Sequence, residues 1–148
     1  MKKILLIILI TLFSSNIASS KNIKEAYFAG GCFWCMEEFF EKVRGVEEVI
    51  SGYSGGNLEN PTYKEVTYGD TGHFEVVKIV YDEDIISYKE ILNFYWKNID
   101  PFDSAGQFCD KGLSYRSVAF YNNQNEKDEI KNSIINIEKE FEGKKVVT

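Results

Sequence analysis

The sequence predicts an α+β fold, a two-layer sandwich in which helices cover a mixed or antiparallel sheet. Strand-like and helical stretches follow one another in the order strand, helix, strand, strand, helix, strand, helix. The chain has 148 residues, 44% of them hydrophobic, which suffices for one domain with its own core. It shows no internal repeat and has only two prolines. This order of elements is that of a ferredoxin-like split βαβ sandwich with an extra C-terminal helix.

The first predicted strand covers residues 23–28 and ends at the pair Gly30-Gly31. Apolar residues then recur at helical spacing between acidic ones, which predicts a helix that ends at Gly45. Residues 46–53 form the second strand, which leads into a long glycine-containing loop at 54–63. We expect this loop to form one wall of a functional site.

The alternating stretch 73–81 predicts the third strand, on which Glu75 shares a face with the apolar residues 77, 79 and 81. Ser87 and Glu90 form a capping-box pattern that begins the second helix, residues 88–99. A second long loop, 100–114, precedes a predicted strand at 115–121. Apolar residues recurring from 130 to 141 mark the last helix, which ends at Gly143.

Residues 1–20 have the layout of a secretory signal peptide. Lys2 and Lys3 precede an apolar run over 4–13 and a small, polar stretch that ends at Ser20. The apolar run is short for a bilayer, so an uncleaved anchor is the weaker alternative. No cysteine follows the run, which argues against lipid attachment there. We therefore predict a signal peptide over 1–20 and an exported, periplasmic or extracytoplasmic domain over 21–148 with no stable membrane association after cleavage.

The charge and the cysteines restrict the function classes. The net charge is −6, and because residues 1–20 contain two lysines and no acid, it becomes −8 after cleavage. Such an acidic domain is a poor partner for nucleic acid or anionic membrane. All three cysteines, Cys32, Cys35 and Cys109, fall in the exported part, and an odd number there indicates at least one working thiol.

Cys32 lies between Gly30-Gly31 and two large aromatic residues, at the predicted start of the first helix. A helix N-terminus favours the thiolate, and the glycines let a substrate approach closely. These features favour a nucleophilic thiol over a small buried core residue. Cys35 adds a C-x-x-C spacing, for which a redox pair is favoured over a zinc site because one pair and one histidine supply few ligands.

Four further residues could carry chemistry or bind a substrate. Phe33 and Trp34 are adjacent, so we expect at least one ring to line an apolar pocket near the thiol, with core packing as the alternative for either ring. Glu75 on an apolar face would keep its proton near neutral pH and could act as an acid, unless it is solvated at the strand end. His73, the only histidine, is either the partner of a nucleophilic cysteine or a structural residue, and the structural interpretation is favoured.

Six motifs follow one another along the chain. They are Gly31-Cys32-Phe33-Trp34, Gly52-Tyr53-Ser54-Gly55-Gly56, Asn60-Pro61-Thr62-Tyr63, Gly69-Asp70-Thr71-Gly72-His73-Phe74-Glu75, Asp100-Pro101 and Gly112-Leu113-Ser114-Tyr115-Arg116-Ser117. In this order and spacing, most of residues 24–148 resembles the peptide methionine sulfoxide reductase A family. A collinear set of six motifs is far more specific than any one of them.

The resemblance implies that the protein reduces S-epimer methionine sulfoxide, in proteins or as the free amino acid, and so repairs oxidative damage. Cys32 would attack the sulfoxide sulfur and become a sulfenic acid, and Phe33 and Trp34 would hold the methyl group of the substrate. Glu75 would protonate the sulfoxide oxygen.

The resemblance also implies that Tyr63 and Tyr115 donate hydrogen bonds to that oxygen and that Asp110 lines the site. A second thiol would resolve the sulfenic acid, and an external dithiol reductant such as a thioredoxin-like protein would complete the cycle. No metal or organic cofactor is expected, and the protein is expected to be a monomer.

The chain departs from the family pattern in two places. The residue after Trp34, commonly Gly in the family, is Cys35. Cys35, one helical turn from Cys32, and Cys109, next to Asp110, are both candidates for the resolving thiol. The chain also ends at Thr148, without the Tyr-His-Gln segment and tail cysteines of many family members, so we expect a C-terminally short member.

Two other functions fit part of the sequence. An exported thiol-disulfide oxidoreductase would use Cys32 and Cys35 and would not need Glu75. A catalytically inactive exported domain would bind peptides through Phe33, Trp34 and the two long loops, and its binding would survive the substitution Cys32→Ser.

Overall fold

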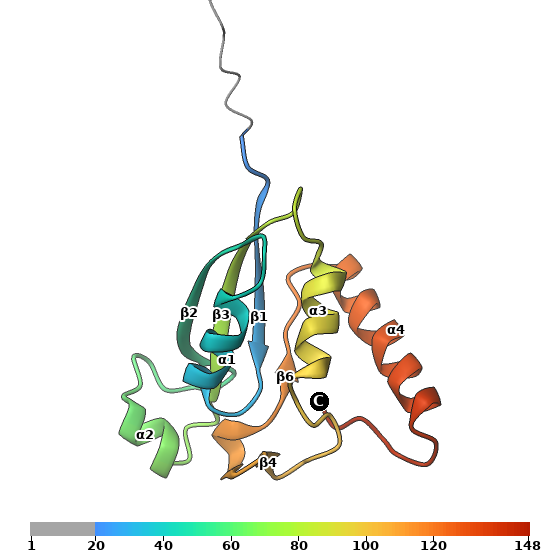
Figure 1. The fold of residues 1–148 in the computed structure, drawn as a ribbon. Coiled ribbons are helices and arrows are strands. Elements are labelled where there is room, and N and C mark those ends of the chain that lie inside the picture. The colour runs from blue at the N-terminus through green and yellow to red at the C-terminus, as the bar shows by residue number, and fades with distance from the viewer. Residues whose placement is uncertain (1–19) are drawn as a thin grey trace, which may run out of the picture.

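A four-stranded antiparallel sheet forms the centre of the computed structural model, which describes residues 20–148 (Figure 1). The predicted signal peptide, apart from Ser20, lies outside the described residues and stays a prediction. The strand order is β2-β3-β1-β6, and every pair of neighbours is antiparallel. The strands of this sheet are β1 (Ile23–Ala29), β2 (Val46–Ser54), β3 (Phe74–Asp82) and β6 (Val118–Ala119). A separate two-stranded hairpin consists of β4 (Gly106–Gln107) and β5 (Asp110–Lys111).

Four α-helices and one 3-10 turn complete the described part of the chain. They are α1 (Phe33–Glu41), α2 (Tyr63–Tyr68), α3 (Tyr88–Lys97), α4 (Gln124–Glu140) and the 3-10 turn η1 (Leu113–Tyr115). Capping boxes begin two of them: Thr62 with Glu65 at α2, and the predicted pair of Ser87 with Glu90 at α3. Asn123 caps α4 through a bond from the backbone N–H of Glu126. No helix within residues 20–148 has the length and apolarity needed to cross a membrane.

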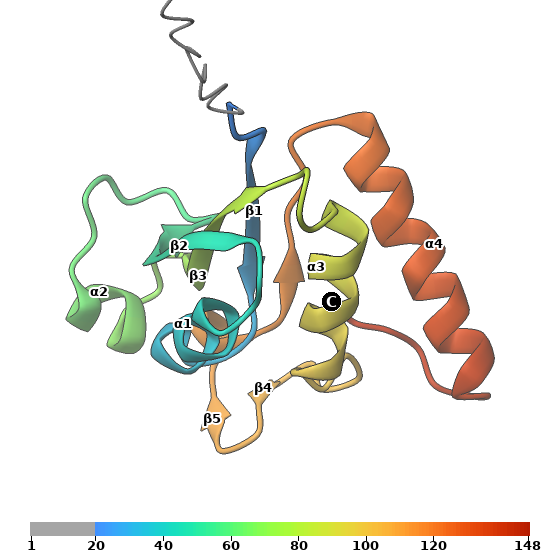
Figure 2. The ribbon, with the colours of Figure 1, turned by 45° about the horizontal axis from the view of Figure 1, so that its top comes forward.

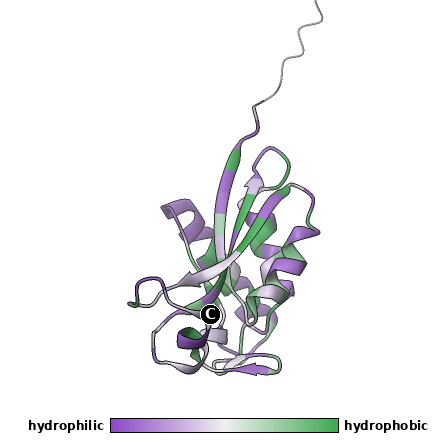
Figure 3. Ribbon diagram, turned by 90° about the vertical axis from the view of Figure 1, so that its left-hand side faces the viewer, coloured by the Kyte–Doolittle hydropathy of each residue, from purple (hydrophilic) through white to green (hydrophobic). Residues whose placement is uncertain are grey.

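The core lies between one face of the sheet and the helices α1 and α3. Phe28 of β1 is at its centre, with its ring centroid 6.1 Å from that of Phe40 in α1 and 4.5 Å from that of Tyr95 in α3. Ile79 of β3 is fully buried beside them. Hydrophobic and hydrophilic residues interleave along the strands, as expected for a sheet with one covered face (Figure 3). The helix α4 packs on the outer side of α3 (Figures 1 and 2). The predicted α+β sandwich with an antiparallel sheet is therefore confirmed.

Several elements of the structure differ from the prediction. The helix α2 was not predicted, because six residues are too few to show helical periodicity, although Thr62 and Glu65 carry the capping signal. The strand predicted at 115–121 is shorter in the structure. Tyr115 belongs to η1, and β6 pairs only Val118–Ala119 with β1, followed by one more backbone bond from the N–H of Phe120 to the carbonyl of Tyr27 at 3.2 Å. The last helix begins six residues before Ile130, because its first turns are polar.

Candidate active site

Cys32 is the N-cap residue of α1, as the sequence predicted. The chain leaves β1 through Gly30 and Gly31, and Gly31 has φ +88°, a conformation that glycine adopts without strain. The carbonyl of Cys32 accepts bonds from the N–H groups of Cys35 (3.1 Å) and Met36 (3.2 Å), so it closes the first turn of the helix. The thiol makes no capping bond and is partly exposed. It therefore lies at the positive end of a nine-residue helix and is open to a reactant.

Glu75 lies behind the first turn of α1. Its carboxylate oxygen Oε2 accepts a hydrogen bond from the backbone N–H of Phe33 at 3.0 Å, while Oε1 is buried without a partner. The residue is only 1% exposed, so the predicted apolar environment is confirmed and the solvated alternative is wrong. Burial raises the pKa of Glu75, the bond from Phe33 opposes this, and the charge of Asp110 adds to it. The net effect favours the protonated form more than in an exposed glutamate, and Oε1 is left without a hydrogen-bond partner.

The two aromatic residues after Cys32 have different environments. Phe33 is 5% exposed, with its ring 5.6 Å from that of Tyr53. Trp34 is 59% exposed and stacks on Tyr63 of α2, with ring centroids 5.6 Å apart and planes inclined by 18°. One ring is therefore in the core and the other lines the surface beside the thiol, as expected. Together with Tyr63 they form an aromatic wall.

Two tyrosines on separate elements meet near this wall. Tyr115 of η1 lies close enough to Tyr63 of α2 and to Glu75 for both groups to affect its pKa. Burial, the neighbouring Tyr63 hydroxyl and the nearby Glu75 together raise the pKa of Tyr115, so the phenol keeps its proton. The structure thus brings both predicted hydrogen-bond donors to the side of the site where Glu75 lies.

The hairpin β4–β5 and the helix α2 lie on different sides of α1 (Figure 2). Asp110 of β5 is half-buried, and its charge raises the pKa of both Glu75 and Cys35, so it lies near both side chains. Partial burial raises the pKa of the Cys35 thiol, and the neighbouring Cys32 thiol raises it further. Cys109 is exposed in the turn of the hairpin, next to Phe108 with φ 47°. Of the two resolving candidates, Cys35 is the one bonded to Cys32, through its backbone N–H.

Sequence reasoning missed two residues that shape the site. Tyr53 lies opposite Glu75 in the β2–β3 ladder and contacts Phe33, and the alternation of β2 was the signal that could have placed it. Gln107 is fully buried and bonds to the backbone of Asp100 and Gly106, and a Cβ atom at Gly31 would lie 2.8 Å from its Cβ. No local pattern distinguishes this glutamine from a surface residue in a polar loop.

His73 does not pair with a cysteine. Its Nδ1 accepts a bond from the N–H of Gly56 at 3.2 Å, and its Nε2 lies 2.9 Å from the carbonyl oxygen of Leu58. Both ring nitrogens are therefore used by the loop that follows β2. The structural interpretation of this histidine is confirmed.

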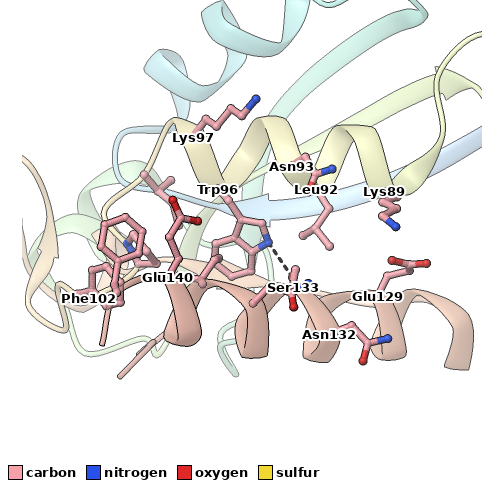
Figure 4. A pocket seen from close by; sticks show the side chains of 15 residues that line it. Lys89, Leu92, Asn93, Trp96, Lys97, Phe102, Glu129, Asn132, Ser133 and Glu140 are labelled. Carbon is pink, nitrogen blue, oxygen red and sulfur yellow. Dashed lines mark hydrogen bonds between the residues drawn. The ribbon is translucent and has the colours of Figure 1, made fainter. Parts of the chain in front are cut away.

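A cavity of about 700 Å³ lies elsewhere, between α3 and α4 (Figure 4). Its walls include Trp96, whose indole N–H donates to Ser133 at 2.9 Å, and it has lysine and glutamate side chains at its rim. None of the predicted site residues lines it. Size alone therefore does not indicate where the chemistry takes place.

Comparison with known proteins agrees with this geometry. The family model described as peptide methionine sulfoxide reductase matches residues 24–148. Among curated proteins, a peptide methionine sulfoxide reductase MsrA of Listeria monocytogenes is 49% identical over 110 residues, which is 74% of this chain and 62% of the relative. The protein of the same name from Bacillus subtilis is 50% identical over 103 residues, 70% of this chain and 58% of the relative.

The solved structures give the same result. Mxr1 of Saccharomyces cerevisiae in its reduced form superposes with a TM-score of 0.76 at 30% identity, covering 85% of this chain and 74% of that one. Methionine sulfoxide reductase A of Corynebacterium diphtheriae superposes with a TM-score of 0.75 at 26% identity, covering 88% and 64%. The chain spans less than two thirds of the length of the two curated relatives. It belongs to the peptide methionine sulfoxide reductase family.

Proposed function

We propose that this protein reduces the S epimer of methionine sulfoxide, in oxidised proteins or as the free amino acid, to methionine. The observation that carries the proposal is the buried, unpartnered Oε1 of Glu75 behind the helix turn that begins at Cys32. Reduction of an S=O bond needs a soft nucleophile at sulfur and a proton at oxygen. A thiol at a helix N-terminus and a carboxylic acid kept neutral by burial supply both.

The reaction would proceed in two protein-based steps. The sulfur of Cys32 attacks the sulfoxide sulfur while Glu75 gives a proton to its oxygen. The oxygen passes to Cys32, so the methionine sulfur is reduced by two electrons and the cysteine is oxidised to a sulfenic acid. A second thiol then attacks the sulfenic acid, which forms a disulfide and releases water. The position of Cys35 one helical turn from Cys32, with its backbone N–H bonded to the carbonyl of Cys32 at 3.1 Å, favours Cys35 over Cys109 for this role.

The surrounding aromatic residues would hold the substrate. Trp34 and Phe33 offer an apolar surface for the methyl group beside the thiol. The hydroxyl groups of Tyr63 and Tyr115 would bind the sulfoxide oxygen, and Asp110 would help to keep Glu75 protonated through its charge. All electrons come from thiols, so we propose no metal or organic cofactor and an external dithiol, such as a thioredoxin-like protein, as reductant.

The direct test is to incubate residues 21–148 with dithiothreitol and each epimer of a methionine sulfoxide peptide and to determine the products by mass spectrometry. We expect consumption of the S epimer and not of the R epimer. Consumption of neither epimer by a folded sample would refute the proposal.

The variant Glu75→Gln separates this activity from the two alternatives. Loss of a general acid lowers the rate by roughly 10²–10⁴-fold. A thiol-disulfide oxidoreductase has no use for the acid, so disulfide exchange through Cys32 and Cys35 should be unaffected. A peptide-binding domain without activity would show no turnover and would bind equally well as Cys32→Ser.

The classification, cellular location and oligomeric state complete the proposal. The antiparallel order β2-β3-β1-β6 supports a ferredoxin-like split βαβ description, because β3 lies between the two strands that α1 connects. The layout of residues 1–20 supports export to the periplasm or an equivalent compartment. We also propose that the mature chain is a monomer. Cell fractionation with N-terminal sequencing tests the export and the cleavage site, and sedimentation tests the monomer.

A further inference from the structure

The loop between β2 and α2 is attached to the segment that begins β3. The N–H of Asn57 donates to the carbonyl of Thr71 at 3.2 Å, and the two ring nitrogens of His73 bond to Gly56 and Leu58. A Cβ atom at Gly56 would lie 2.4 Å from Cδ2 of His73, so the backbone of the loop runs directly against the imidazole. The histidine is 8% exposed. It is thus a buried clamp with a partner on each nitrogen.

The two partners fix the protonation state of the ring. Nδ1 faces an N–H donor and must accept, and Nε2 faces a carbonyl oxygen and must donate. Only the neutral imidazole with its proton on Nε2 satisfies both bonds. This tautomer links Gly56 and Leu58. No other side chain among residues 20–148 forms a hydrogen bond with either of them.

The clamped loop leads directly to Tyr63. Four residues after Leu58, Thr62 caps α2 in its capping box with Glu65, and Tyr63 is the first residue of that helix. The position of the loop therefore sets the position of the helix that stacks Tyr63 on Trp34. A displacement of about 1 Å in such a group can change a rate by about 10²-fold.

We propose that His73 is a positioning residue of the proposed reaction, which holds Tyr63 beside Trp34 and Tyr115 by clamping Gly56 and Leu58. This inference rests on the proposed function, since the role of Tyr63 is to bind the sulfoxide oxygen. The ring nitrogens of His73 bond to Gly56 and Leu58 and not to Cys32. Its effect passes through the loop and α2.

A double-mutant cycle tests the inference. His73→Phe keeps an aromatic ring and removes both bonds, and we expect kcat/KM to fall roughly 10- to 100-fold. In a Tyr63→Phe background the same substitution should have almost no further effect, because the group that it positions is gone. Alkylation of Cys32, followed by mapping of the labelled peptide, should proceed at the wild-type rate in a folded variant. The matched control is Ser133→Ala, which removes a hydrogen bond between α3 and α4 and should leave kcat/KM unchanged.

Losses that multiply in the double variant, or wild-type activity of His73→Phe, would overturn the inference. If His73→Phe does not fold, His73→Gln replaces it, because the Gln amide can occupy the place of Nε2 and keep the Leu58 bond, and partial activity is expected. Nitrogen NMR of the wild-type protein gives a test without catalysis, in which a proton on Nδ1 contradicts the clamp. A wild-type protein inactive on both epimers would refute the proposed function while this NMR result still decides the tautomer.

Discussion

Replacing Gln107 with leucine tests how the loop beneath the reactive helix is held. The side chain of Gln107 accepts a bond from the N–H of Asp100 at 2.7 Å and donates to the carbonyl groups of Asp100 at 2.9 Å and Gly106 at 2.8 Å. All of these partners are backbone groups, and the glutamine is 0% exposed. Leucine has a similar volume, so the substitution removes hydrogen bonds and leaves little cavity.

The expected cost follows from the number of bonds. Each intramolecular hydrogen bond contributes about 1 kcal/mol net, so the loss of three lowers the free energy of unfolding by about 3 kcal/mol. With a urea dependence of about 2 kcal/mol per molar, the midpoint of unfolding should fall by about 1.5 M. Circular dichroism during urea titration measures both quantities.

The matched control is Gln124→Leu. Gln124 is exposed at the start of α4, and its amide bonds only to Asp128 on the same helix. Its replacement should change the free energy of unfolding by no more than about 0.5 kcal/mol. If both leucine variants unfold at the same urea concentration, the three bonds of Gln107 do not hold the loop, and the reasoning from buried backbone partners is wrong.

Three further outcomes are expected. The pKa of Glu75 is raised above its ordinary value of 4.5, so with rising pH the unfolded chain loses this proton before the folded protein does. Glu75→Gln should therefore be more stable than wild type at pH 7 in thermal melts. A stability difference that persists unchanged at pH 4 would contradict the raised pKa. Trp34→Ala removes an exposed ring and should lower the free energy of unfolding by about 1 kcal/mol while KM rises more than kcat falls; an unchanged KM in steady-state assays would exclude the methyl-binding role. After reaction with S-sulfoxide in the absence of reductant, the wild-type protein should contain a Cys32–Cys35 disulfide. The variant Cys35→Ser should instead contain a sulfenic acid at Cys32 that dimedone traps. If the trapped sulfenic acid is found in Cys109→Ser and not in Cys35→Ser, the resolving thiol is the one in the hairpin.

Local patterns were sufficient for much of the fold. The alternation in β3, the capping box of Ser87 and Glu90 and the glycines after β1 are decided by interactions within a few residues, and the structure confirms them. The placement of Cys32 at the N-cap of α1 was predicted for the same reason. Where elements are short, periodicity fails, which is why α2 and the β4–β5 hairpin lay inside segments that were not assigned or were taken as loop.

The candidate site was likewise predicted only in part. Residue types and motif order along the sequence identified the thiol, the acid and the aromatic pair, because each depends on its neighbours in the chain. The unpartnered oxygen of Glu75 and the two bonds of His73 were decided only by the tertiary structure. The reason is physical: whether a buried group finds a partner depends on which segments, up to dozens of residues apart, the packed sheet and helices bring together.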